Sequence, residues 1–282
     1  MPRAAVLGSP ITHSRSPRLH LAAYRALGLT DWTYERIECS AERLPDLVAG
    51  LGSEWVGLSV TMPGKSAALA VAAERSARAG LVGSANTLVR TATGWRADCT
   101  DVDGVRDALI GAGVTDLAGA AAVVLGAGGT ARPALLALAG LGAAQVSLVV
   151  REPARAASAR ALAARLGMAV EVAGFDGAGG FDPATVRAVC AAARVVVSTV
   201  PAGAAVPIAA AVGPTPTLLD AIYDPWPTPL ASAVEAAGGR VVSGLEMLLA
   251  QAYGQVEQFT GRPAPRAAMR AALDSPALDP PG

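Results

Sequence analysis

The chain has 282 residues, enough for two hydrophobic cores, and its 23 basic and 23 acidic residues give a formal net charge of zero. The lack of a basic surplus argues against a nucleic-acid-binding protein. No apolar run reaches membrane-span length without interruption by Gly, Arg or Pro, and the first residues do not resemble a signal peptide. We therefore expect a cytoplasmic protein with no membrane partner.

The cysteines and the lysine also limit the chemistry. Cys39, Cys99 and Cys190 lie too far apart for a disulfide framework or a metal pattern, so we expect a reducing compartment and no bound metal. Lys65 is the only lysine among the 23 basic residues, and Asn86 is the only asparagine. Arginine stays protonated in proteins, whereas lysine exchanges a proton. One interpretation is that Lys65 has a role in proton exchange that arginine cannot fill. The alternative is survival by chance, and composition alone does not decide between them.

The N-terminal part alternates predicted strands and helices. Its strands are predicted at residues 3–8, 32–38, 56–60, 88–90 and 94–97, and its helices at 17–27, 41–50, 65–79 and 105–110. Ser14 and Ser16 precede Pro17, with Ser16 expected as the N-cap of the first helix. Two hydroxyls and backbone N–H groups at a helix start suit a small carboxylate, although ordinary capping needs only one of the serines.

Two further stretches place polar side chains beside this predicted sheet. Lys65 begins a predicted helix directly after the strand at 56–60, and ligands bind at the carboxyl ends of strands in open α/β sheets. Asp98, Asp101 and Asp103 lie between the predicted hairpin and the next helix. Capping and turn chemistry account for at least one of these carboxylates.

A glycine-rich loop organises the C-terminal part. The predicted strand at 123–125 leads into the pattern G-x-G-x-x-A, which is followed by a helix to residue 140 and a strand at 145–150. The pattern comprises Gly126, Ala127, Gly128, Gly129, Thr130 and Ala131. In a chain with 31 glycines a plain glycine-rich turn is the alternative, but the flanking strand and helix favour a dinucleotide site.

The remaining elements continue this alternation. Further strands are predicted at residues 169–173, 194–199, 217–221 and 240–242, and further helices at 155–166, 183–193, 229–237, 244–259 and 265–273. The alternation predicts an α/β fold of two lobes, one of them a Rossmann-like doubly wound parallel sheet. We assign residues 1–104, joined by helices in 245–282, to an α/β substrate-binding and catalytic domain. Residues 105–244 form the predicted dinucleotide-binding domain, and 275–282 are expected to fray.

Ordered motifs along the chain together resemble the shikimate dehydrogenase family. The matching stretches are residues 8–20, Val60-Thr-Met-Pro-Gly-Lys65, Ala85-Asn-Thr-Leu88, Thr100-Asp101, Gly126-Ala-Gly-Gly129, residues 220–230, Gly244-Leu-Glu-Met247 and Gln251-Ala252. The resemblance implies an oxidoreductase that reversibly reduces 3-dehydroshikimate to shikimate with NADPH, in the shikimate pathway of aromatic amino-acid biosynthesis. The substrate is then a small molecule, and we expect a monomer or a homodimer.

The resemblance also implies roles for individual residues. Lys65 and Asp101 would be the proton-transfer pair, because hydride addition to a ketone leaves an alkoxide that must gain a proton. The residues that would bind substrate are Ser14 and Ser16 at the carboxylate, Thr61, Asn86 and Gln251 at the ring hydroxyls, and Tyr223 between substrate and cofactor. The residues that would bind the cofactor are Gly126, Ala127, Gly128, Gly129, Thr130, Ala131, Arg151, Arg155, Thr199, Ile222, Gly244 and Met247.

Three positions depart from the family pattern. Cys99 replaces an asparagine and lacks an amide's donors, so the local loop is expected to differ while catalysis is kept. Phe259 replaces a tryptophan, a mild packing change. Val150-Arg-Glu152 replaces the family's Asn-Arg-Thr after the second strand of the cofactor lobe. Arg151 and Arg155 suit a 2′-phosphate, whereas Glu152 could repel it or bond the ribose hydroxyl of NAD, and we favour NADP over NAD.

Two other functions remain open on the sequence. The first is a quinate or aminoshikimate dehydrogenase of the same family, since the motifs do not separate closely related rings. The second is a nucleotide-binding regulator without catalysis. A regulator needs the glycine loop but gives no reason for Lys65, Asn86 and Asp101 to occur together.

Overall fold

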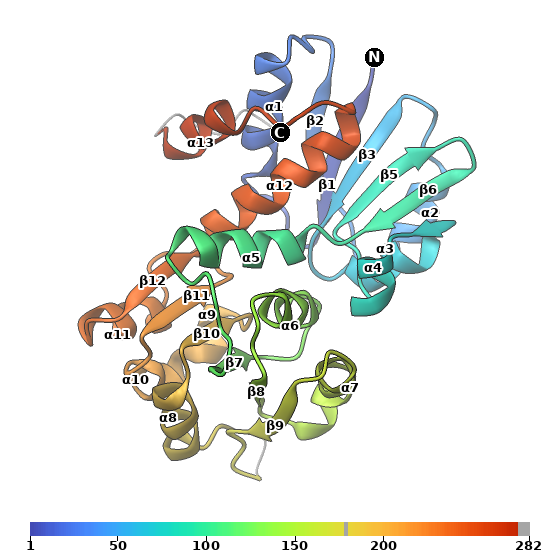
Figure 1. Ribbon diagram of the computed structural model, residues 1–282. Coiled ribbons are helices and arrows are strands. Elements are labelled where there is room, and N and C mark those ends of the chain that lie inside the picture. The colour runs from blue at the N-terminus through green and yellow to red at the C-terminus, as the bar shows by residue number, and fades with distance from the viewer. Residues whose placement is uncertain (178–179, 276–282) are drawn as a thin grey trace. The chain divides into compact units, whose positions relative to one another are not determined.

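The computed structural model describes residues 1–177 and 180–275, which form two compact units (Figure 1). The first unit contains Met1–Asp101 and the chain from Leu248 onward, and the second is Val102–Met247. The domain boundaries predicted at residues 104 and 244, with the role assigned to each domain, stay a prediction. The frayed end predicted at 275–282 lies outside the described residues except for Ser275.

A mixed six-stranded sheet forms the centre of the first unit, in the order β2-β1-β3-β5-β6-β4. Its strands are β1 (Arg3–Gly8), β2 (Thr33–Glu38), β3 (Trp55–Val60), β4 (Glu74–Arg75), β5 (Thr87–Thr91) and β6 (Gly94–Asp98). Strands β2, β1 and β3 are parallel, whereas the hairpin of β5 and β6 joins antiparallel to β3 through β5. The carboxyl ends of β1, β3 and β6 and the start of β5 therefore share one edge of the sheet.

Helices cover both faces of this sheet. One face carries α1 (Ser16–Ala26) and the end of α12 (Gly244–Thr260), where Tyr24 and Phe259 pack on Val6 of β1, and α13 (Arg266–Asp274) packs against α1. The other face carries α2 (Leu44–Ala49) and α3 (Lys65–Val71), whose apolar side chains join the core around Leu7 and Leu58. The helix α4 (Ala77–Val82) lies beside β6, and α5 (Asp101–Gly111) begins shortly after that strand ends.

Three predicted helices have different bounds in the structure. The helix predicted over 65–79 ends at Val71, because Ala72 turns to an extended conformation and the chain then pairs as β4 with β6. Ser76 caps α4 by accepting a hydrogen bond from the N–H of Ala79 at 3.1 Å, which starts a second helix instead. The helix α2 is shorter than predicted, and α5 starts four residues earlier, at Asp101.

The second unit confirms the predicted doubly wound sheet. Its strands are β7 (Ala121–Leu125), β8 (Gln145–Val149), β9 (Ala169–Ala173), β10 (Val195–Ser198), β11 (Thr217–Asp220) and β12 (Arg240–Ser243). All neighbours are parallel, in the order β12-β11-β10-β7-β8-β9. The chain reverses its direction of winding between β7 and β10, the position at which open α/β sheets bind ligands.

The connections between these strands are mostly helical. They are α6 (Ala131–Gly140), the 3-10 turn η1 (Pro153–Ala156), α7 (Ala157–Arg165), α8 (Pro183–Ala192), α9 (Ala202–Ala205), the 3-10 turn η2 (Val206–Ile208), α10 (Ala209–Val212) and α11 (Pro229–Ala236). The short turns α9, η2 and α10 were not predicted from the sequence. Pro207 interrupts the apolar run at 202–212, so no continuous helix forms there.

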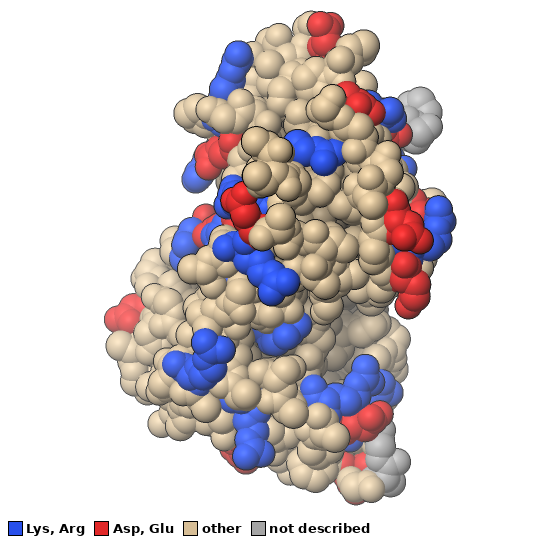
Figure 2. Space-filling model, turned by 90° about the vertical axis from the view of Figure 1, so that its right-hand side faces the viewer, with Lys and Arg blue, Asp and Glu red and all other residues tan. Residues whose placement is uncertain are grey.

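The surface carries both signs of charge (Figure 2), and the cysteines form no disulfides. Acidic and basic side chains are interspersed over the face shown in Figure 2. The three cysteines are buried and free. Among residues 1–177 and 180–275, no helix is both long and apolar enough to cross a bilayer.

His20 lies in an aromatic stack inside the first unit. Its ring is fully buried, stacks on Tyr34 with ring centroids 4.0 Å apart, and lies 5.6 Å from the ring of Phe259. Phe259 passes over Gly57, where an added Cβ would lie 2.2 Å from the phenyl ring. Burial lowers the pKa of His20 to about 3, against a smaller opposing effect of its hydrogen bond with Gln255.

We predict that His20 makes the protein less stable in mild acid. The unfolded chain protonates this histidine near its usual pKa of 6.5, whereas the folded chain stays neutral until about 3. The free energy of unfolding should therefore fall by about 2 kcal/mol between pH 7 and pH 5. Urea unfolding of the parent and of His20→Gln at both pH values measures the effect, with His13→Gln as the matched control. An equal loss in the parent and His20→Gln would refute the assignment.

Candidate functional site

Polar side chains from separate segments meet at the shared edge of the first sheet. Lys65 is the first residue of α3 and follows β3, while Asn86 immediately precedes β5. Asp101 is the first residue of α5, shortly after β6 ends. Gln251 reaches the same cluster from α12. The sheet topology and α12 thus bring together four of the predicted site residues.

Lys65 and Asp101 form a close ion pair. The Nζ atom of Lys65 donates to Oδ2 of Asp101 at 2.5 Å. The side chains are 13% and 6% exposed, so water screens the pair only weakly. A charge-assisted hydrogen bond of this kind holds the ammonium group in one direction. Because an ammonium group has several N–H donors, its bond to the carboxylate is compatible with donation to a ligand oxygen as well.

The amide of Asn86 connects this pair to the rest of the site. Its Oδ1 accepts the backbone N–H of Thr100 at 2.8 Å, and its Nδ2 donates to Oδ1 of Asp101 at 3.0 Å. A backbone N–H only donates and a carboxylate only accepts, so these contacts determine which way the amide points. Nδ2 also lies 2.6 Å from Oε1 of Gln251. Asn86 therefore joins Asp101 and Gln251.

The two serines lie at the start of α1, but the predicted capping is wrong. Ser16 is the first residue of the helix, and Arg15 occupies the N-cap position without a side-chain hydrogen bond. The Oγ of Ser14 instead accepts the backbone N–H of Ser16 at 3.4 Å. Both serines are buried, and the hydroxyl of Ser16 makes no capping bond to its own helix.

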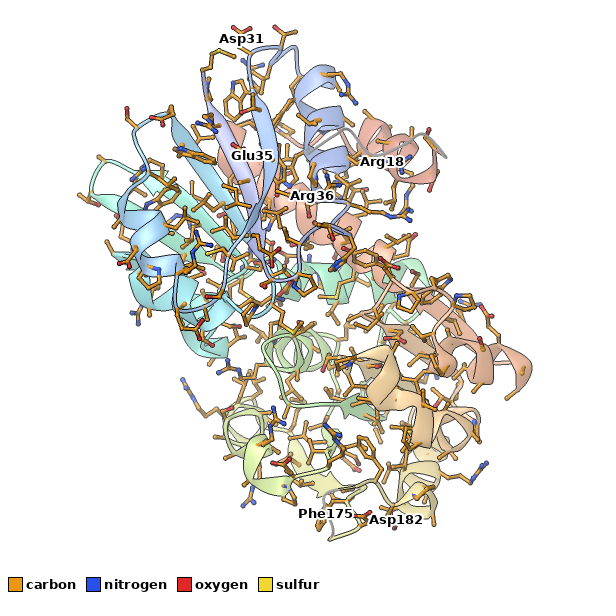
Figure 3. All side chains as sticks on the ribbon, turned by 180° about the vertical axis from the view of Figure 1, so that it is seen from behind. Arg18, Asp31, Glu35, Arg36, Phe175 and Asp182 are labelled. Atoms are coloured by element: carbon orange, nitrogen blue, oxygen red, sulfur yellow. The ribbon has the colours of Figure 1, made fainter. Side chains whose placement is uncertain are left out.

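A charged side chain holds the serine loop in place. Arg36, labelled in Figure 3, lies on β2. Its Nε donates to the backbone carbonyl of Ser14 at 2.9 Å. This bond fixes the loop against the sheet and places a guanidinium beside the serines. The positive charge favours an anionic ligand at the same place.

Thr61 follows β3 at the same edge and depends on a glycine beneath it. A Cβ added to Gly8 would lie 2.4 Å from Cγ2 of Thr61 and 2.9 Å from the carbonyl oxygen of Met62. Gly8 thus allows the end of β1 and the segment after β3 to approach closely. Thr61 belongs to the short segment that leads from β3 into Lys65 and α3.

Two neighbouring residues have structural roles. Asp98 accepts two hydrogen bonds from Arg78, at 2.7 and 2.5 Å, and one from Ser76 at 2.5 Å. Burial alone would raise the pKa of Asp98, but the bonds and charge of Arg78, together with Ser76, lower it to about 2. Burial raises the pKa of the Cys99 thiol to about 12, so this thiol stays neutral in the core.

Sequence reasoning missed a second layer of polar residues behind the site. Its members are Tyr34, Ser59, Thr87, Thr100 and Gln255. One signal was present, because Gln255 lies four residues after Gln251 and therefore on the same face of the helix. The others lie on strands or next to them, where a buried hydroxyl is not distinguishable by sequence from an ordinary core threonine or serine.

The glycine loop of the second unit has room for a ligand at its second glycine. Gly126 has a φ of +97°, and a Cβ there would lie 2.7 Å from Oγ1 of Thr199. Thr199 in turn donates to the carbonyl of Leu125 at 2.8 Å. A Cβ on Gly128 would meet nothing within 4 Å, which is the open approach that a pyrophosphate needs. The loop residues thus fit a dinucleotide at the start of α6.

The other predicted cofactor residues lie at the carboxyl ends of the same parallel strands. Arg151 follows β8 and Arg155 lies in η1, and both are exposed, as is Glu152. Thr199, Ile222 and Gly244 follow β10, β11 and β12 in the same way. Gly244 requires a small residue, because a Cβ there would lie 2.4 Å from the carbonyl oxygen of Ala221.

Met247 is buried in α12 and Tyr223 is partly buried after β11, both in the second unit. Their predicted places beside the nicotinamide and the substrate stay predictions.

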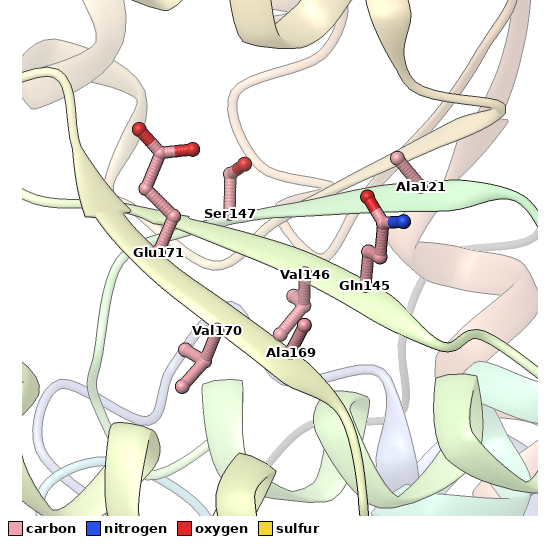
Figure 4. A pocket seen from close by; sticks show the side chains of 7 residues that line it. All are labelled: Ala121, Gln145, Val146, Ser147, Ala169, Val170 and Glu171. Carbon is pink, nitrogen blue, oxygen red and sulfur yellow. The ribbon is translucent and has the colours of Figure 1, made fainter.

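A shallow pocket lies at the opposite edge of the second sheet (Figure 4). Its lining includes the first residues of β7, β8 and β9, namely Ala121, Gln145 and Ala169. It therefore lies at the amino ends of strands whose carboxyl ends lead to the predicted cofactor residues. No group of three or more His, Cys, Asp or Glu side chains able to hold a metal ion occurs in the described parts of the chain.

Family models match both ends of the sequence. Residues 6–88 match the shikimate dehydrogenase substrate binding domain, and residues 244–273 match the shikimate 5′-dehydrogenase C-terminal domain. The first match includes the serines, Thr61, Lys65 and Asn86, and the second includes Gln251.

Whole-length relatives agree with these matches. A curated shikimate dehydrogenase (NADP(+)) from Anaeromyxobacter sp. (strain K) is 38% identical over 280 residues, which cover 96% of this chain and 95% of the relative. The crystal structure of Mycobacterium tuberculosis shikimate dehydrogenase is 60% identical with a TM-score of 0.88, covering 97% of this chain and 99% of that one. The shikimate 5-dehydrogenase of Thermus thermophilus, solved in complex with NADP(H) and shikimate, is 29% identical with a TM-score of 0.79, covering 97% and 98%.

Proposed function

The chain belongs to the shikimate dehydrogenase family, and we propose that it catalyses the reversible NADPH-dependent reduction of 3-dehydroshikimate to shikimate in aromatic amino-acid biosynthesis. The observation that carries the proposal is the 2.5 Å pair of Lys65 and Asp101 at the sheet edge. Such a pair suits proton transfer to a ring oxygen, and the names of the relatives supply the substrate and the cofactor.

Lys65 is the proton donor in this proposal. Bound NADPH supplies the hydride, and the developing alkoxide needs a proton at the same oxygen. The ammonium group of Lys65 gives that proton, while Asp101 orients the ammonium group and stabilises its charge before transfer. In the reverse reaction the neutral amine of Lys65 accepts the proton from the hydroxyl.

The same edge of the sheet binds the rest of the substrate. Ser14 and Ser16 hold the carboxylate beside the guanidinium of Arg36, and Thr61 and Asn86 hold ring hydroxyls. The Oε1 of Gln251 already accepts from Asn86, so its N–H groups are the ones that donate to a hydroxyl. Tyr223 lies between substrate and cofactor in this scheme.

The second unit binds the cofactor. The loop from Gly126 to Ala131 holds the pyrophosphate, and Arg151 with Arg155 holds the 2′-phosphate that distinguishes NADP from NAD. The residues proposed to line the remaining cofactor site are Thr199, Ile222, Gly244 and Met247. The enzyme functions in the cytoplasm as a monomer or a homodimer.

The proposed function is tested by assaying cofactor reduction with shikimate, quinate and aminoshikimate, each with NADP and with NAD. The highest kcat/KM is expected for shikimate with NADP. A higher value for quinate or aminoshikimate would reassign the substrate within the family. Cofactor binding without turnover of any of these rings would indicate a regulator instead.

We predict that Lys65→Arg lowers kcat by about 10²–10⁴-fold, because arginine keeps the charge but does not release a proton. Steady-state kinetics with shikimate at saturating NADP measure the effect, after circular dichroism has shown that the variant is folded. If Lys65 only binds substrate, the variant should lose affinity and keep most of its kcat. A kcat within about fivefold of the parent would therefore overturn the acid–base role.

We predict that Arg151→Ala raises the KM for NADP much more than the KM for NAD, because only NADP carries the phosphate that Arg151 contacts. A lost charge-assisted bond of about 1.5–3 kcal/mol corresponds to roughly a 10- to 150-fold change. Arg165→Ala, at an exposed position on α7, is the matched control and should change neither KM. Equal effects of Arg151→Ala on both cofactors would show that Arg151 does not read the phosphate.

A further inference from the structure

We propose that Gln255 is a positioning residue that couples the carboxylate-binding end of the site to the proton-transfer pair. The assignment of these two ends rests on the function proposed above. Gln255 is 1% exposed and lies one turn after Gln251 on α12. Its side chain hydrogen-bonds to two chains of polar groups, one leading to each end of the site.

The orientation of the Gln255 amide follows from a backbone carbonyl. Its Nε2 lies 3.1 Å from the carbonyl oxygen of Asn86, which only accepts. Nε2 must therefore face Asn86, and Oε1 must face Ser59 at 2.8 Å and His20 at 3.3 Å. Both of these groups then donate to Oε1. Burial keeps the His20 ring neutral, so it has one N–H group. The bond to Oε1 places that proton on Nε2.

One chain of bonds leads from Gln255 to the serines. Because the hydroxyl of Ser59 donates to Gln255, its oxygen is the acceptor for the hydroxyl of Tyr34, at 2.7 Å. Burial raises the pKa of Tyr34, whereas Ser16 lowers it, as a hydroxyl that donates to the phenol oxygen does. The proton of Tyr34 is committed to Ser59, so Ser16 must supply the proton in its bond with Tyr34. The position of Ser16, and with it the carboxylate-binding end, therefore depends on Gln255 through Ser59 and Tyr34.

The other chain leads to the proton-transfer pair. Nε2 of Gln255 donates to Oγ1 of Thr87 at 3.1 Å, and Thr87 donates to Oδ1 of Asn86 at 3.0 Å. Asn86 donates in turn to Asp101, which accepts from Lys65. Each donor between Gln255 and Asp101 points toward the catalytic carboxylate. Gln255, Thr87, Asn86 and Asp101 are each at most 4% exposed, so water does not replace a lost bond readily.

If the Gln255 amide were reversed, an acceptor would face an acceptor and donors would face donors. Oε1 would face the carbonyl of Asn86, and the N–H groups of Nε2 would face the donors Ser59 and His20. Thr87 would then direct its proton to Oε1, and the amide of Asn86 would lose one of the bonds that hold it toward Asp101. Removing Gln255 therefore changes the proton-transfer end and the carboxylate end together, although Gln255 touches no substrate in the proposed site.

The test compares two variants. Gln255→Met keeps the volume and removes the hydrogen bonds of Gln255, whereas Thr87→Val leaves the branch toward Ser16 intact and removes the hydroxyl that links Gln255 to Asn86 and contacts Thr100. Gln258→Met is the matched control, because Gln258 lies on the same helix and bonds to Arg96 and Asp98 instead. Labelling with ¹⁵N-asparagine gives a single side-chain amide signal, since Asn86 is the only asparagine. That signal is recorded without substrate, and kcat and KM for shikimate are measured in parallel.

We expect Gln255→Met to shift the Asn86 amide signal, to lower kcat by about 10- to 100-fold and to raise KM. Thr87→Val should shift the signal and lower kcat with a smaller change in KM, and Gln258→Met should leave all three unchanged. An unshifted Asn86 signal in Gln255→Met, with kcat within about threefold of the parent, overturns the proposal.

Should Gln255→Met not fold, the same criteria apply to Thr87→Val, whose unshifted signal would break the proposed chain to Asn86. Failure of the parent to oxidise shikimate would refute the proposed function, while the substrate-free Asn86 signal would still report on the role of Gln255.

Discussion

The hydrogen bonds of Asn86 hold the first unit's site together. Its amide accepts from the backbone at Thr100 and donates to Asp101 and to Gln251, so it joins the start of β5 to the first residue of α5 and to α12. All of these groups are buried, and an unmatched partner there would carry the full cost of desolvation. This requirement explains how residues far apart in the sequence keep one geometry.

The sheet order determines which residues can meet at this position. Strands β1 and β3 are parallel neighbours, so the segments that follow them leave from the same edge. The hairpin of β5 and β6 enters antiparallel to β3, which brings Asn86 and Asp101 to that edge from the start of one strand and the end of the other. In the second unit the parallel order places the glycine loop next to the point where the winding reverses.

Much of this arrangement could be predicted because local signals agreed with the fold. The glycine loop lies between a strand and a helix as its pattern requires, and the alternation in the second unit indicates a parallel sheet. The helix predicted across residues 65–79 was wrong because pairing of β4 with β6 overrides local helix propensity. The layer containing Ser59 and Thr87 was not predicted, because its hydrogen bonds join strands to a helix distant in sequence.

The only lysine of the chain lies in the proposed site and is 13% exposed. Apart from the α-amino group, the protein therefore offers amine-reactive reagents one target. Acylating probes, amine crosslinkers and coupling resins that attach through a lysine side chain would therefore modify the proposed proton donor. Mass spectrometry after such labelling would measure the fraction of molecules modified at Lys65, without a probe designed for the proposed site.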